Sequence, residues 1–226
     1  FISWWEDAAG IRQARACDKA GLRIETVHAG YTDVNEVWLE GAAGEGDLTF
    51  LLHALEQTAA LGVRTMIVHV SSGDAPPPFG ETGLRRFARL CGRADALGVA
   101  IAFENLRKTD YLAYVLEGLE NPSARFCFDC GHENIYNGGA GVLERFAPRL
   151  AALHLHDNFG RQDDHMVPFT ASIDWDRIAR RLAAAKIAVP VTLECHRDGG
   201  SEGFAREAYA AACRLEEAIL SYWPEV

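Results

Sequence analysis

Short apolar runs that end abruptly in an acidic or histidine side chain recur along this chain, and they constrain its fold more than any other feature. The clearest run spans residues 150–155, contains His154 and continues into His156 and Asp157. A short apolar run followed by polar residues is typical of a buried strand in a parallel sheet. Further runs of this kind end in His28, His69, Glu104, Asp129 and Glu194. Nearly every predicted strand therefore delivers reactive side chains to its C-terminal end.

The alternation of these runs with longer segments of mixed polarity predicts repeated strand–helix units. We expect strands near 1–5, 23–28, 64–69, 99–104, 125–129, 151–156 and 189–194. We expect helices at 9–20, 49–61, 81–97, 110–120, 175–186 and 203–221, and a short helix within 138–146. Asp47 and Asp174 are placed to cap the helices that follow them, and Gly21, Gly62 and Gly98 to end helices. The segments 29–47 and 71–83 are expected to be long loops.

Alternating strands and helices predict an α/β fold with a parallel sheet. An open, doubly wound sheet gathers its ligand site at one switch point, whereas a barrel directs every strand end to one face. Because nearly every predicted strand here ends in polar side chains, we expect a (β/α)8-type TIM barrel. The seven strands are one fewer than such a barrel needs, so the chain is expected to lack the first strand–helix unit. Residues 1–226 are expected to form a single domain.

Composition limits the partners of the chain. The net charge of −10 and the lack of a basic stripe argue against nucleic acid, because phosphate binding uses a surplus of Lys and Arg. The six cysteines are scattered, which indicates reduced thiols and a reducing compartment. The sequence shows neither a signal peptide nor a run of about 18 apolar residues. We therefore expect a cytoplasmic protein that does not enter a membrane.

Four strand-end residues are candidates for a metal site. In a barrel, Glu104, Asp129, His154 and Glu194 would point into one mouth. Three carboxylates and an imidazole cannot be buried together without a compensating positive charge, and a divalent cation is the simplest one. Oxygen-rich ligands with one imidazole suit Mn²⁺, Mg²⁺, Co²⁺ or Fe²⁺, and additional histidines would favour Zn²⁺. The alternative is that each residue separately begins a loop or caps a helix.

Further polar residues have two interpretations each. His28 and His69 can line the same mouth or lie in the core, and His132 can contact substrate or metal. Asp163 and His165 can complete a second metal site or remain exposed. His156 is expected to be structural or to support a ligand from behind. His196 and Arg197 can bind an anionic or hydroxyl-rich substrate or face solvent.

Several ordered motifs together resemble the xylose-isomerase-like barrel superfamily, which contains sugar-phosphate isomerases and epimerases and endonuclease IV (AP endonuclease family 2). The motifs are Phe103-Glu104-Asn105, Phe128-Asp129-Cys-Gly-His132, Leu153-His154-Leu-His-Asp157-Asn158, Asp163-Asp-His165 and Thr192-Leu-Glu194. The resemblance implies that Glu104, Asp129, His154 and Glu194 bind a divalent metal. In the epimerase branch it also implies that the two glutamates move protons and that His132 contacts substrate. In the endonuclease branch His28, His69, Asp163 and His165 match further metal ligands.

The sequence and the resemblance together predict a divalent-metal-dependent isomerase or epimerase of a sugar or sugar phosphate. The expected partner is a small polyhydroxy carbonyl substrate, converted through an enediolate with Glu104 and Glu194 as acid and base. His132, His69, His28 and Arg197 are the expected substrate-binding residues, with Mn²⁺ preferred and Zn²⁺, Mg²⁺ or Co²⁺ as alternatives. An endonuclease IV-like phosphodiester hydrolase, a lyase or dehydratase, and a truncated barrel that only binds ligands remain open. A homo-oligomer is compatible with all of these.

Overall fold

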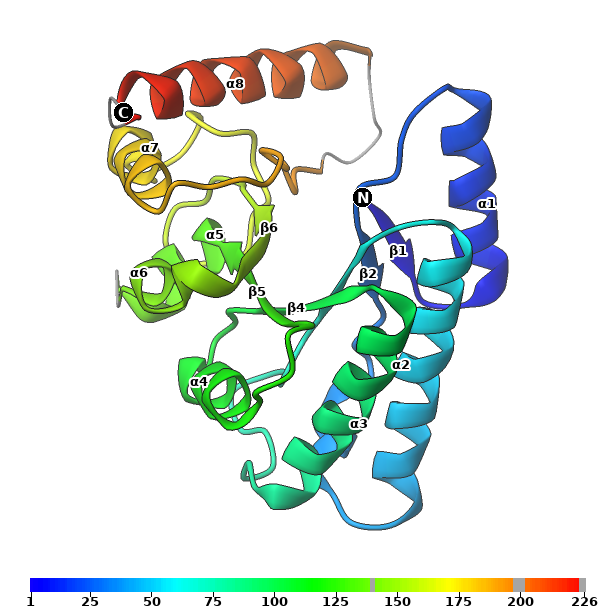
Figure 1. The fold of residues 1–226 in the computed structure, drawn as a ribbon. Coiled ribbons are helices and arrows are strands. Elements are labelled where there is room, and N and C mark those ends of the chain that lie inside the picture. The colour runs from blue at the N-terminus through cyan, green and yellow to red at the C-terminus, as the bar shows by residue number, and fades with distance from the viewer. Residues whose placement is uncertain (139–140, 197–201, 224–226) are drawn as a thin grey trace. The chain divides into compact units, whose positions relative to one another are not determined.

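A computed structural model describes residues 1–138, 141–196 and 202–223 of the chain. The chain is an α/β protein that divides into two compact units, Phe1–Phe126 and Cys127–Val226 (Figure 1). Strand β5 (Ala124–Asp129) begins in the first unit and ends in the second. The strands follow one another in sequence order, from β1 to β6.

The first unit contains parallel strands whose C-terminal ends lie at one edge. The strands are β1 (Ile2–Trp4), β2 (Val27–Ala29), β3 (Thr65–Val68) and β4 (Ala100–Glu104). Ser3 pairs with His28 across β1 and β2, and Val68 pairs with Phe103 across β3 and β4. The backbone amide of Ile101 donates to the carbonyl of Ser123, at the start of β5, over 2.8 Å. Because the strands are parallel and in register, residues that end them share one edge of the sheet.

Helices connect these strands, as the apolar spacing of the sequence predicts. They are α1 (Asp7–Lys19), the 3₁₀ helix η1 (Val34–Trp38), α2 (Ala42–Ala60), α3 (Glu81–Leu97) and α4 (Thr109–Gly118). Figure 1 shows α2 and α3 side by side. Phe87 of α3 is fully buried against Phe103 of β4, with ring centroids 5.2 Å apart. Helix α3 therefore anchors the strand that presents Glu104.

The second unit continues from β5 into a series of short helices before strand β6 (Leu150–His154). They are α5 (Cys130–His132), the π-helix η2 (Glu133–Asn137), α6 (Val142–Phe146) and the 3₁₀ helix η3 (Ala147–Arg149). Helices α7 (Trp175–Ala184) and α8 (Glu202–Ser221) pack against each other. Ala211, Leu215 and Ile219 recur every fourth residue on α8 and are buried, which gives this helix one apolar face.

Most predicted elements are confirmed, and their ends follow ordinary capping chemistry. Gly21, Gly62 and Gly98 follow helices with φ of 66°, 72° and 65°, the left-handed conformation that glycine adopts without strain. Asp174 caps α7 by accepting a hydrogen bond from the amide of Arg177 over 3.0 Å. The expected strand at 189–194 is reduced to a single parallel bridge between Leu155 and Leu193.

The expected start of the second helix is wrong. Helix α2 begins at Ala42 after Gly41, within the segment expected to be a loop, so Asp47 lies inside the helix and is not its N-cap. The run of small residues after Gly41 lacks the apolar spacing on which the expectation was based. Asp47 is instead buried, with 6% of its surface exposed. Burial, followed by the charges of Asp33 and Glu36, raises the pKa of Asp47 to about 7.

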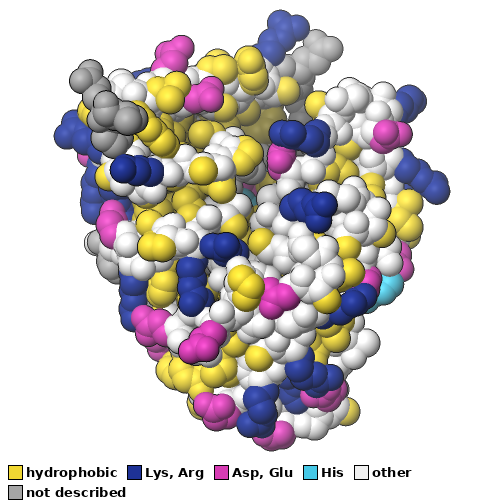
Figure 2. Space-filling model, in the orientation of Figure 1, with side chains coloured by type: hydrophobic (Ala, Val, Ile, Leu, Met, Phe, Trp, Pro, Cys, Tyr) yellow, Lys and Arg dark blue, Asp and Glu magenta, His cyan; other side chains and the backbone are white. Residues whose placement is uncertain are grey.

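The surface shows no single dominant charge pattern on the face seen in Figure 2. Lys and Arg side chains there are interspersed with Asp, Glu and hydrophobic side chains. Among the helices of the described residues, none combines the length and the apolar composition needed to cross a bilayer.

The raised pKa of Asp47 predicts a pH-dependent stability. An unfolded chain releases this proton near pH 4 and the folded chain only near pH 7, so the free energy of unfolding falls as pH rises between these values. Asp47→Asn removes the ionisation, and we expect it to stabilise the protein above pH 7 by on the order of a few kcal/mol. Urea denaturation of both proteins at pH 4.5 and pH 8 measures the effect. An equal difference at both pH values would contradict it.

Candidate metal centre

In the first unit, two histidines meet one carboxylate at the ends of neighbouring strands. Nε2 of His28 lies 3.4 Å, and Nε2 of His69 lies 3.1 Å, from Oε2 of Glu104. Glu104 is buried, with 1% of its surface exposed. Nδ1 of His28 lies 2.8 Å from the carbonyl oxygen of Ala29, which can only accept, so this nitrogen carries a proton. A neutral His28 therefore presents a lone pair to the Glu104 carboxylate, and a proton or a metal cation is needed between them.

In the second unit, Asp129 ends β5 and turns the chain into α5. Its Oδ1 accepts a hydrogen bond from the amide of His132 over 2.6 Å, which makes Asp129 the N-cap of this short helix. The carboxylate is completely buried. A Cβ atom at Gly131 would lie 2.0 Å from the ring of His156, so only glycine allows the turn to approach that ring. The Asp-x-x-His spacing thus fixes both a carboxylate and an imidazole at this strand end.

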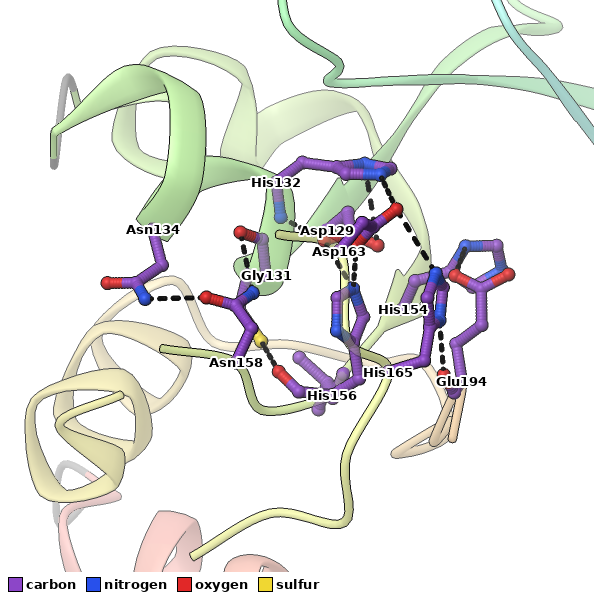
Figure 3. Close-up of polar contacts among 12 residues, drawn as sticks. Asp129, Gly131, His132, Asn134, His154, His156, Asn158, Asp163, His165 and Glu194 are labelled. Atoms are coloured by element: carbon purple, nitrogen blue, oxygen red, sulfur yellow. Dashed lines mark hydrogen bonds and ion pairs between the residues drawn. The ribbon is translucent and has the colours of Figure 1, made fainter. Parts of the chain in front are cut away.

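Strand β6 delivers His154 to the same region of the second unit (Figure 3). Nδ1 of His154 lies 2.9 Å from Oε2 of Glu194. His154 is completely buried, whereas 17% of the Glu194 side chain is exposed. Asp129, His154 and Glu194 each offer one ligand atom, and these atoms lie within 4.8 Å of one another. Such spacing between two carboxylates and an imidazole fits a divalent cation that all three contact.

A second cluster surrounds Asp163, which lies in the loop after β6. Oδ2 of Asp163 lies 3.2 Å from Nε2 of His132 and 3.2 Å from Nε2 of His165. Oδ1 of Asp163 lies 3.5 Å from Nε2 of His156, whose ring stacks on that of His165 at 4.1 Å. His156, His165 and Glu194 also offer ligand atoms within 4.8 Å of one another. The Asp-x-His motif is therefore part of a group able to hold a cation.

The charges of this second cluster are strongly coupled. Burial raises the pKa of Asp163, but hydrogen bonds from His132 and His165 outweigh burial and hold it well below the ordinary value. Burial lowers the pKa of His165, but the hydrogen bond and the charge of Asp163 raise it to about 9. At His156, burial lowers the pKa of the imidazole, but the charge of Asp129 and its hydrogen bond outweigh burial, so the pKa is raised. Without a metal, protons on these imidazoles balance the carboxylates.

Asp157, which the sequence analysis placed at a strand end without a role of its own, anchors a loop of the second unit. Oδ2 of Asp157 accepts hydrogen bonds from the amides of Thr170 and Ala171 and from Nε1 of Trp175, over 2.8–3.1 Å. Oδ1 accepts from the amides of Asn158 and Ile173. Five donors on one buried carboxylate fix the loop between β6 and α7. This loop carries Asp163 and His165, so Asp157 positions the second cluster without belonging to it.

The predicted site residues fall into groups within each unit. His28, His69 and Glu104 gather in the first unit, and Asp129, His132, His154, Asp163, His165 and Glu194 gather in the second. His156, expected to be structural, lies among them with its Nε2 3.3 Å from Oδ1 of Asp129. His196 is exposed, with its ring 4.8 Å from that of His165. Arg197 lies outside the described residues.

Tyr31 was not predicted to belong to the site, and Asn158 was placed in a strand-end motif without a role of its own. The ring of Tyr31 stacks on that of His69 at a centroid distance of 4.1 Å. Nδ2 of Asn158 donates to the carbonyl of Gly131 over 3.0 Å, and its Oδ1 accepts from Asn134 over 2.8 Å. Asn158 follows the strand-end pattern and could have been found, because an amide at a strand end often ties two loops together. Tyr31 lies in a loop without a recognisable pattern.

Parallel strands that end in carboxylates and imidazoles define a class of α/β proteins that bind ligands at the C-terminal ends of their strands. The family model named xylose isomerase-like TIM barrel matches residues 5–216, and the chain belongs to that family.

Relatives of known sequence and structure agree with this assignment. Uncharacterized protein y4fM of Sinorhizobium fredii is 32% identical over 243 residues, covering 92% of this chain and 78% of that protein. The structure of a D-tagatose 3-epimerase-like protein is similar with a TM-score of 0.75 at 17% identity, covering 96% of this chain and 84% of the other. D-psicose 3-epimerase of Clostridium cellulolyticum H10, crystallised with D-tagatose, gives the same TM-score and identity, with 96% and 85% covered. At these identities the structural similarity shows the fold.

Replacing Asp157 tests its role as an anchor. Asp157→Asn keeps the shape but turns one acceptor oxygen into an NH₂ group that faces hydrogen-bond donors. We expect the free energy of unfolding to fall by about 2–4 kcal/mol, since buried donors lose a charged partner. Chemical denaturation measures the change. Asp164→Asn is the control because, within the described part of the chain, the Asp164 carboxylate accepts one long hydrogen bond, from the amide of Phe159. Equal stability of the two variants would contradict the anchoring role.

Proposed function

We propose that this protein is a divalent-metal-dependent isomerase or epimerase of a sugar or sugar phosphate. The observation that carries the proposal is the approach of ligand atoms of Asp129, His154 and Glu194 to within 4.8 Å of one another, at and beyond the strand ends of the second unit. The family assignment and the sugar epimerases among the similar structures support the same class of reaction. The proposed substrate is a small polyhydroxy carbonyl compound.

The proposed metal ligands are Asp129, His154, Glu194 and Glu104. The first three fit a divalent cation by the spacing of their donor atoms, and Asp129 and His154 are also completely buried. Glu104 is assigned as the fourth from its position at the end of β4 and from the family resemblance. Carboxylates with one imidazole favour Mn²⁺, with Mg²⁺, Co²⁺ and Zn²⁺ as alternatives.

A bound divalent ion would supply Lewis-acid polarisation of substrate oxygens. In the proposal, one of Glu104 and Glu194 removes the proton from the carbon next to the substrate carbonyl, and the other returns a proton to the enediolate. Glu194 is suited to this role because part of its side chain is accessible. His132 is proposed to bind a substrate hydroxyl, since Asp163 and Asp129 fix its ring. His28, His69 and Arg197 are proposed as further substrate contacts.

A multi-metal phosphodiester hydrolase is a second candidate function. One observation favours it, namely the grouping of His156, His165 and Glu194 within 4.8 Å, with Asp163 beside the two histidines. In that case Asp163 and His165 would hold a second metal ion, and histidine-rich ligands would favour Zn²⁺. The net charge of −10 is unfavourable for a nucleic acid substrate.

Metal content separates these candidates. After purification and exhaustive dialysis, we expect one divalent ion per chain by inductively coupled plasma mass spectrometry. His154→Gln should lose this ion, since it removes a buried ligand, whereas His53→Gln should retain it because His53 pairs with Asp7 at the surface. Two or three zinc ions per chain would favour the hydrolase. A chain that holds no ion, even after dialysis against Mn²⁺, would leave only a binding role.

The roles of the two glutamates can be tested by proton exchange. With D-tagatose, D-psicose and L-ribulose in D₂O, we expect deuterium at the carbon next to the carbonyl of at least one sugar. Glu104→Gln and Glu194→Gln should each slow turnover by roughly 10²–10⁴-fold, because each removes a proton-transfer group. Glu207→Gln, at an exposed position of α8, serves as the control. Full turnover by both active-site variants would refute the assignment.

A further inference from the structure

A cavity of about 310 Å³ lies in the first unit, lined by none of the proposed ligands. It is bounded by the loop after β1, the segment around η1 and the first half of α2. Two aromatic side chains, Trp5 and Phe50, and three acidic ones, Asp33, Glu36 and Asp47, face it. Among the described residues that line it, none is Lys or Arg. The cavity therefore combines apolar walls with a lining that is acidic and not basic.

Asp47 shows that this is more than a cluster of surface acids. Its side chain lines the cavity although only 6% of the residue is exposed. Its Oδ2 has no hydrogen-bond partner within the described chain. A buried carboxylate without a partner is costly, and an apolar residue at this position would avoid the cost. Since Asp47 does not cap α2, its carboxylate has no local structural role that explains it.

The charged groups near Asp47 do not neutralise its carboxylate. Asp33 and Glu36 add to the negative potential and contribute, after burial, to raising the pKa of Asp47. Among the described residues, Arg86 of α3 is the cation whose charge acts against them at Asp47. Its guanidinium is already held by Oε1 of Glu45 over 3.0 Å and by the carbonyl of Val37 over 2.7 Å. A bound cation would convert the unfavourable carboxylate into a paired one.

The shape of the cavity distinguishes an organic cation from a metal ion. Asp33, Glu36 and Asp47 do not form one of the groups of ligand atoms within 4.8 Å of one another found among the described residues. A metal ion would therefore lack a preformed set of ligands. Aromatic walls, by contrast, suit a cation with a carbon chain, through cation–π attraction and apolar contact. A volume near 300 Å³ is at the lower end for small-molecule sites.

We propose that this cavity binds a small organic cation, with an ammonium or guanidinium group against Asp47 and its carbon chain against Trp5 and Phe50. None of the residues that line this cavity is among those proposed for the metal centre or for substrate binding. It would give the protein a second small-molecule ligand, of opposite charge to the acids that surround it.

Calorimetric titration of the full chain with cadaverine and with agmatine tests the proposal, with 1,5-pentanediol as the neutral match of cadaverine. We expect saturable binding of at least one amine and none of the diol. Binding should tighten from pH 6 to pH 8 as Asp47 ionises beside Asp33, Glu36 and Arg86. Absence of binding by both amines, equal binding of the diol, or tighter binding of Ca²⁺ than of either amine would overturn it.

Two variants locate the ligand. Asp47→Asn should weaken amine binding at least about tenfold, because it removes the charged partner while keeping the shape. Gly46→Leu should abolish binding by filling the cavity, since a Cβ at Gly46 meets no atom within 4 Å and the residue lines the cavity. Glu120→Gln, which removes an exposed charge at a distance, should bind as the unaltered chain does. Glu194→Gln, which alters the proposed metal centre and not the cavity, should leave amine binding intact. Unchanged affinity in both cavity variants would refute the site.

Discussion

The crowding of carboxylates and imidazoles at buried strand ends is the constraint on which the account of this protein depends. Asp129 and His154 are completely inaccessible, and Glu194 lies 2.9 Å from His154. Burying carboxylates this close together is costly, because like charges repel and burial removes their water. Protons or a cation must therefore balance the charge. In the neighbouring cluster, the raised pKa of His165 and the lowered pKa of Asp163 reflect the same close coupling of buried opposite charges. A divalent cation would balance the carboxylates at Asp129 and Glu194.

The fold supports this crowding at some cost in conformational freedom. Gly131 has no side chain because the ring of His156 occupies the space a Cβ would need. Asp157 fixes the following loop through five hydrogen-bond donors, so that Asp163 and His165 are held beside His132 and His156. His165 itself has φ of 47°, which is uncommon for a residue other than glycine. A left-handed backbone held by surrounding hydrogen bonds is typical of functional loops.

Much of the architecture could be predicted because strand ends and helix ends carry local signals. Apolar runs that end in Glu104, Asp129 or His154 identified strands, and the glycines after α1, α2 and α3 identified the ends of those helices. The start of α2 could not be predicted, because small residues after Gly41 give no apolar period and the helix depends on tertiary packing there. The anchoring by Asp157 could not be predicted either, because four of its five donors lie 13 to 18 residues further along a loop without a pattern. The seventh strand was predicted to be longer than it is, because an apolar run suggests burial. The apolar residues at 189–193 are in fact half-exposed, and this segment forms a single described bridge.

The central claim is that Asp129, His154 and Glu194 share one divalent cation. The most direct test is a crystal structure of the protein soaked in Mn²⁺, with anomalous diffraction recorded at the manganese absorption edge. The account predicts an anomalous peak at about 2.0–2.3 Å from one donor atom of each of these three residues. A map without a peak there, or with manganese bound only by residues elsewhere, would contradict it.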